Sequence, residues 1–183
     1  MYLLNKCSTK SITSKVIDAA KSGDCKKLVK LLACKKASNS VAIPYTKESI
    51  KRDVELIKQS SVEIPLTDSE YAAAVILTML HKTHKSTISL LKENGYEPVP
   101  SERLSYIGTY ICTLSTINDF KSINLKKYSI SSCGDERVCK VCAKHDGKVH
   151  MVANAHIGKN APPFCDKCRC IILPIFNYSS TIK

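Results

Sequence analysis

Six of the ten cysteines lie in the last third of the chain, and their spacing is the feature of this sequence that could do chemistry. Two Cys-x-x-Cys pairs, Cys139 with Cys142 and Cys165 with Cys168, are separated by 22 residues. Each pair can direct two thiolates at one point, and four thiolates satisfy a tetrahedral Zn²⁺ ion. The sequence therefore predicts one structural zinc ion bound by Cys139, Cys142, Cys165 and Cys168.

Other side chains near the two pairs compete for the ligand positions. Cys170 is the first alternate, because Cys168-Arg-Cys170 places two thiols on one side of an extended segment. His145 and His156 lie between the pairs, and either could replace a cysteine. A disulfide or a redox role for the pairs is the competing interpretation. The residues from Met1 to Cys7 have no basic leader or long apolar stretch, so we expect no secretion signal, and this expectation favours metal in a reducing compartment.

Catalytic motifs are missing from the sequence. Nucleobase deaminases combine H-x-E with P-C-x-x-C, whereas here Pro163 precedes Cys165 by two positions and no histidine is followed two places later by Glu. H-E-x-x-H, G-x-S-x-G and the P-loop are also absent. Because a four-thiolate site leaves no open position for water, we predict a non-enzymatic protein without catalytic residues.

Composition limits the class of protein and its partners. Hydrophobic residues make up 44% and charged residues 24% of the 183 residues, which is typical of a soluble globular chain and excludes wholesale disorder. The longest apolar run has roughly half the length of a membrane-spanning helix, so no membrane partner is predicted. The net charge of +12 is spread along the chain, so any contact with DNA is expected to be non-specific, and a Lys-rich protein without a nucleic-acid role is the alternative.

Helical periodicity dominates the chain from residue 12 to residue 126. Asp24 is a predicted N-cap, Thr67 to Glu70 has the spacing of a capping box, and Asn94-Gly95 is a helix stop signal. Beyond residue 130, short β-prone runs (148–152 and 170–176) lie among Gly, Pro and Cys. We therefore predict an α+β chain: a mainly α domain over residues 1–130 and a small, loop-rich β module, stapled by zinc, over residues 131–183.

The C-terminal motifs resemble those of a known family. Cys133-Gly-Asp-Glu-Arg-Val-Cys-Lys-Val-Cys-Ala-Lys-His-Asp-Gly-Lys-Val149, followed by Ala161-Pro-Pro-Phe-Cys-Asp-Lys-Cys-Arg-Cys170, is similar to the signature of phage head morphogenesis proteins, the minor head proteins of the Mu F-like type. The matching positions, in order, include Asp135, Arg137, Cys139, Cys142, Asp146, Gly147, Lys148, Pro162, Pro163, Cys168, Arg169 and Cys170.

The resemblance also implies a ligand set and a place for the motif residues. The family usually has His where this chain has Cys165, so a Cys-Cys-His-Cys set would become all-thiolate here. We expect Asp146-Gly147 to form the turn after the first pair and Pro162-Pro163 to fix the approach to the second pair. Arg169 is expected to hydrogen-bond a turn carbonyl or an acidic partner.

What the resemblance implies for function is a minor component of the phage head. Such a protein would assemble with portal or capsid proteins, oligomerise only within that assembly, and occur in the virion or in the host bacterial cytoplasm rather than being secreted. One alternative is a zinc-ribbon nucleic-acid-binding or regulatory protein of a mobile element. The other is an ankyrin-like interaction adaptor, suggested by the helical-hairpin patterns at 16–32 and 80–95.

Overall fold

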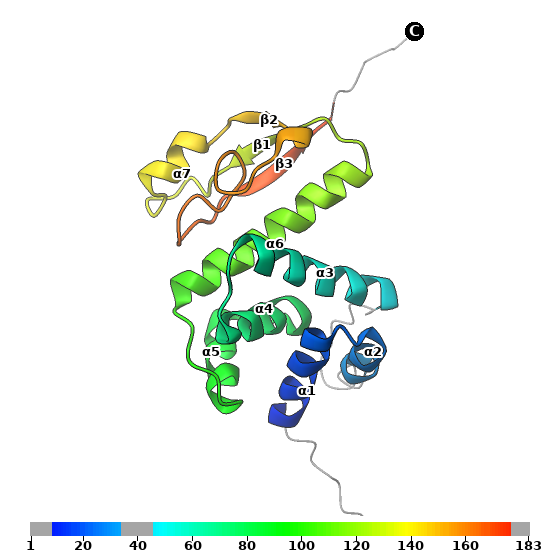
Figure 1. Cartoon of the computed structure of the whole chain (residues 1–183). Coiled ribbons are helices and arrows are strands. Elements are labelled where there is room, and N and C mark those ends of the chain that lie inside the picture. Colours follow the sequence, from blue (N-terminus) through cyan, green and yellow to red (C-terminus); the bar gives the residue numbers. More distant parts are fainter. Residues whose placement is uncertain (1–8, 34–45, 177–183) are drawn as a thin grey trace, which may run out of the picture. The chain divides into compact units, whose positions relative to one another are not determined.

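The computed structural model describes residues 9–33 and 46–176 of the chain. Within these ranges the protein has seven α-helices and one small three-stranded antiparallel sheet (Figure 1), so the predicted α+β class is confirmed. The chain divides into two compact units, Met1–Leu104 and Ser105–Lys183. None of the helices in the described ranges is long and apolar enough to cross a membrane.

The described part of the first unit is helical. Its elements are α1 (Thr9–Ser22), α2 (Cys25–Ala33), α3 (Lys47–Glu63), α4 (Asp68–Leu80) and α5 (His84–Glu93). A longer helix, α6 (Ser101–Ser122), contains the division between the units. The core of the first unit is centred on α4, where Ala72 to Ile76 and Met79 are fully buried.

Helix caps stand at the positions that the sequence predicts. The Asp24 carboxylate accepts a hydrogen bond from the Lys27 N–H at 2.9 Å, at the start of α2. The Thr67 hydroxyl accepts from the Glu70 N–H, and the Glu70 carboxylate accepts from the Thr67 N–H, so the capping box before α4 is complete. These bonds satisfy amide groups that have no partner within the helix.

The second unit places a sheet against the second part of α6. Its elements are β1 (Lys127–Ser131), α7 (Lys140–His145), β2 (Val149–Met151), a 3-10 turn (Val152–Asn154) and β3 (Ile171–Ile175). β1 is the central strand and pairs antiparallel with β2 and with β3, giving the order β2-β1-β3. Pro174 lacks an N–H and is placed in β3, an edge strand, where it disrupts little.

Every second side chain of β1 points into the core of this unit. Tyr128 and Ile130 are almost completely buried, whereas Lys127 is exposed. The buried core of the unit also draws on α6, on the loops around α7 and on β3, and three of its members are cysteines. These core residues are Ile117, Phe120, Tyr128, Ile130, Cys142, Val152, Ala161, Cys168, Cys170 and Ile172.

The opposite face of the sheet remains apolar in part. Val149 and Met151 of β2 and Ile171 and Leu173 of β3 are all more than two-fifths exposed. Because successive side chains of a strand point to opposite faces, these residues lie on the face turned away from Tyr128.

The structure differs from the expected organisation at two elements. β1 starts at Lys127, ahead of the boundary at residue 130, and belongs to the sheet of the second unit. The predicted β-prone runs do form β2 and β3, but α7 was not predicted. Both elements are short, and neither carries the run of apolar residues that marks a strand or helix in the sequence.

Candidate metal centre

Two chain segments carry the clustered thiols of the second unit. Cys139 is the N-cap residue of α7, and its sulfur accepts a hydrogen bond from the Cys142 N–H at 3.4 Å. The second pair lies in the loop before β3, where the Cys168 N–H donates to the Cys165 carbonyl at 3.0 Å. Each Cys-x-x-Cys segment is therefore folded into a tight turn.

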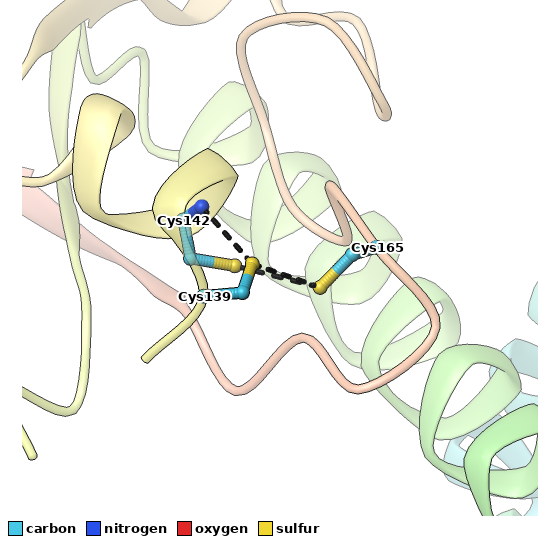
Figure 2. A group of neighbouring side chains, drawn as sticks. All are labelled: Cys139, Cys142 and Cys165. Carbon is cyan, nitrogen blue, oxygen red and sulfur yellow. Dashed lines mark hydrogen bonds between the residues drawn. The ribbon is translucent and has the colours of Figure 1, made fainter. Parts of the chain in front are cut away.

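Three sulfurs from these segments point toward one another (Figure 2). The Cys165 Sγ lies 3.5 Å from the Cys139 Sγ and 3.7 Å from the Cys142 Sγ. With Zn–S bonds of about 2.3 Å, the edges of a tetrahedron of sulfurs measure about 3.8 Å. The observed spacing thus matches the size of such a site.

A second group of sulfurs shares one member with the first. The Cys142 Sγ lies 3.6 Å from the Cys168 Sγ, and these two sulfurs form a group with Cys170 in which all are within 4.8 Å of one another. The structure therefore divides the predicted ligands between two groups that share Cys142: one holds Cys139, Cys142 and Cys165, and the other holds Cys142, Cys168 and the alternate Cys170. All eight cysteines in the described ranges are free thiols, so the disulfide interpretation gains no support there.

The thiols differ in how readily they lose a proton. The Cys142 N–H, donating to sulfur, is the main reason why the pKa of Cys139 is lowered to about 7. Burial raises the pKa of Cys142 above its ordinary value and raises the pKa of Cys170 to about 12. Sulfurs that are held together in this way favour a divalent cation, which replaces the protons and stabilises the thiolates.

An ion pair anchors the second cysteine segment. The Arg169 guanidinium donates to both carboxylate oxygens of Asp135, at 2.8 Å and 2.5 Å. Asp135 also accepts from the backbone and side chain of Arg137, at 3.1 Å and 3.2 Å. The acidic partner expected for Arg169 is thus Asp135, and these donors hold the pKa of the Asp135 carboxyl well below its usual range.

The turn after α7 has the expected form. Asp146 is the C-cap of α7, and its carboxylate accepts from the Ser132 N–H at 2.6 Å. Gly147 has a φ of 70°, which glycine adopts without strain, and its N–H donates to the Ile130 carbonyl at 2.8 Å. The turn therefore binds the end of α7 to the central strand. In the segment that leads to the second cysteine pair, the peptide bond between Pro162 and Pro163 is cis.

The histidines that the sequence offered as alternates lie outside both sulfur groups. The ring of His145 stacks on Phe164 with centroids 3.8 Å apart, and its buried Nδ1 has no hydrogen-bond partner within the described ranges. The Nδ1 of His156 lies 3.0 Å from the Ile157 carbonyl oxygen. His145 thus serves packing beside the centre.

Sequence reasoning missed one residue that positions the centre. The Thr109 hydroxyl on α6 donates to the Cys168 carbonyl at 3.1 Å. This bond spans 59 residues. No local spacing could have indicated it, because α6 meets the cysteine loop only through the folded core of the second unit.

The fold and the site define a class: a small sheet packed on a helix, with a compact cluster of cysteine thiols in its loops. Residues 112–173, about a third of the chain, match the family model of phage Mu protein F like proteins. The match confirms the resemblance found in the cysteine-rich signature and extends it upstream into α6. Neither a curated protein nor a solved structure matches this chain.

Proposed function

We propose that this protein is a non-enzymatic head-morphogenesis protein of a phage, a minor head protein that assembles with portal or capsid proteins. The observation that carries the proposal is the match to Mu F-like proteins over residues 112–173, which includes the whole thiol cluster, the second half of α6, β1, β2 and the first part of β3. The virion, or the host cytoplasm during assembly, is its proposed location.

We further propose that one zinc ion, bound by Cys139, Cys142, Cys165 and Cys168, holds the C-terminal module in shape. The support is the sulfur spacing of 3.5–3.7 Å and the burial of Cys142 and Cys168 in the core. Four thiolates close the coordination sphere, so the ion would be structural rather than catalytic. Structural zinc binding in small domains is worth about 10–16 kcal/mol near neutral pH, which is as large as the whole stability of an ordinary domain.

The proposal is tested by following the full-length chain through assembly of its phage. It should co-sediment with portal-containing or capsid particles. The double variant Cys142→Ser with Cys168→Ser should lose this association, because the module that carries the family signature would unfold. Cys112→Ser is the matched control, since Cys112 is an exposed thiol of α6 outside both sulfur groups.

A different outcome would favour the alternative assignment. Recovery only as a free species that binds DNA, with an affinity that falls steeply as salt rises, would contradict the head-protein proposal. That result would indicate a zinc-containing nucleic-acid-binding protein instead.

A further inference from the structure

The outer face of the sheet in the second unit exposes apolar side chains along both of its edges. Four large aliphatic side chains of the edge strands β2 and β3 are 42–54% exposed: Val149, Met151, Ile171 and Leu173. Strand pairing places the two edges on one face, because Ser129 of β1 lies opposite both Val149 and Leu173. Exposed apolar patches of this kind often mark an interaction site.

The dimensions of this face fit an α-helix. The aliphatic side chains lie on the two strands that flank β1, and neighbouring strands are about 4.8 Å apart, so the two rows are about 10 Å apart. Between them β1 contributes the small, half-buried side chains of Ser129 and Ser131. Because a helix with its side chains is about 10–12 Å wide, a helix laid over β1 would contact both rows. A helix already packs on the inner face, where Ile117 and Phe120 of α6 join Tyr128 in the core.

The charge on this face decides which kind of helix it can accept. Lys127 is exposed and lies opposite Met151 on one side and Ile175 on the other. Within the three described strands it is the only Lys, Arg, Asp or Glu, and the residues that precede β1 and β2, Lys126 and Lys148, are exposed lysines as well. A partner that covers the face must therefore supply carboxylates, because moving a lysine away from water without an opposite charge nearby is unfavourable.

A second copy of this chain does not meet that requirement. Face-to-face association would bring two Lys127 side chains into one interface, and each copy carries a net charge of +12. Four half-exposed aliphatic side chains also provide less than the roughly 800 Å² that each partner buries in a stable interface. The face therefore suits one helix of a different protein, docked within a larger assembly.

We propose that the outer face of this sheet binds an acidic amphipathic α-helix of another protein of the assembling head. The helix lies over Ser129 and Ser131, and its aliphatic stripe contacts the exposed side chains of β2 and β3. A Glu or Asp beside that stripe pairs with Lys127. The inference deepens the proposed function, because it names the surface and the partner chemistry through which the protein would join the head.

Charge reversal tests the inference in the assembling phage. Lys127→Glu should reduce the amount of full-length protein that co-sediments with head particles by about 10-fold or more, because two carboxylates would then repel each other where an ion pair stood. Lys159→Glu is the matched control, since it makes the same charge change at an exposed turn of the same unit and should leave co-sedimentation unchanged. Both variants should keep the metal content and the circular dichroism of the unaltered protein, because both lysines are exposed.

A photoreactive side chain identifies the partner. With p-benzoylphenylalanine in place of Leu173, irradiation of assembling particles should join this chain to a helical segment of another protein in which Glu or Asp flanks an aliphatic stripe. The same group in place of Val62, which is 83% exposed on α3, is the control and should not join to that segment.

The outcomes separate the inference from the proposed function. Equal co-sedimentation of Lys127→Glu and the unaltered protein would overturn the inference but not the proposed function. A cross-link from position 173 to a second copy of this chain, to DNA or to no molecule would also overturn the inference alone. Absence of the unaltered protein from the particles would overturn both.

Discussion

Arg169 lies between Cys168 and Cys170, and its guanidinium donates two hydrogen bonds to the Asp135 carboxylate. The planar fork of arginine matches a carboxylate at two points, which lysine cannot do. Since the side chains of both residues are about one-third exposed, this pair adds little to global stability. Its value is geometric, because it fixes the backbone from which Cys168 and Cys170 project.

We predict that Arg169→Lys speeds release of bound zinc to a chelator by about 10-fold, as loss of outer-shell support does in other metal sites. The matched control is Arg137→Lys, because Arg137 also contacts Asp135 but its side chain is largely exposed and makes one longer bond, at 3.2 Å. Equal release rates in the two variants would show that Arg169 does not position the cysteine loop.

Glu70 has two roles at the start of α4. It completes the capping box with Thr67 and accepts a 2.7 Å bond from the Arg103 guanidinium. This bond is the main reason why the pKa of the Glu70 carboxyl is lowered from its ordinary value. A lowered pKa means that the charged form stabilises the fold above the ordinary pKa, and that this contribution is lost as the pH falls through the folded-state value.

We predict that Glu70→Gln lowers the free energy of unfolding by about 0.5–1 kcal/mol at neutral pH. The amide oxygen of Gln can still accept from Thr67, so the substitution removes mainly the charge. The difference between the two proteins should therefore shrink as the pH falls below about 4, the ordinary range of a Glu carboxyl. Urea unfolding followed by circular dichroism measures it, and a difference that is independent of pH would contradict this account.

At the scale of elements, β1 is the strand on which the second unit depends. It pairs with both neighbours, and its buried side chains meet Ile117 and Phe120 of α6 in one core. Its Ile130 N–H and carbonyl also bond the turn after α7, through Lys148 and Gly147. A substitution that disrupts β1 should thus destabilise the sheet, its packing on α6 and the turn after the first cysteine pair together.

We predict that Ile130→Ala destabilises the second unit by about 2–5 kcal/mol, because it leaves a cavity where the side chain is 1% exposed. Ile123→Ala is the matched control, since Ile123 is 60% exposed and its truncation should change stability by less than about 0.5 kcal/mol. Hydrogen exchange of the β1 and β3 amides measures both variants. Similar protection in the two would show that the buried face of β1 does not stabilise the sheet.

Local signals explain which elements could be predicted from the sequence. The caps at Asp24 and Thr67 and the strands near Val149 and Ile171 depend on neighbouring residues, so their patterns are visible in the chain. β1 offers only two apolar residues in alternation, Tyr128 and Ile130, and its strand geometry comes from partners up to 48 residues away. A strand that depends on pairing with distant segments cannot be recognised from its neighbouring residues in the sequence.

The candidate site was predictable in its members but not in its arrangement. Cys-x-x-Cys spacing identified the four predicted ligands, and the Cys168-Arg-Cys170 spacing identified the alternate. The sharing of Cys142 between two sulfur groups depends on how the loop before β3 meets α7, which spacing does not encode. The hydrogen bond from the Thr109 hydroxyl to this loop could not be predicted from the sequence for the same reason.

At the scale of the whole molecule, the two units differ in what holds them together. The first unit has a large apolar core centred on α4. The core of the second unit contains three cysteines among its ten buried residues. Since thiols crowded in a core need a cation to keep them as thiolates, metal should stabilise the second unit far more than the first.

The most direct measurement of the central claim is amide hydrogen exchange on the full-length protein before and after removal of metal by a strong chelator, with reductant present throughout. The account predicts that the amides of β1, β2, β3 and α7 lose most of their protection, that those of α3 and α4 keep theirs, and that added zinc restores the first set. Unchanged protection of the sheet in metal-free protein would contradict the claim that an ion held by these sulfurs maintains the C-terminal module.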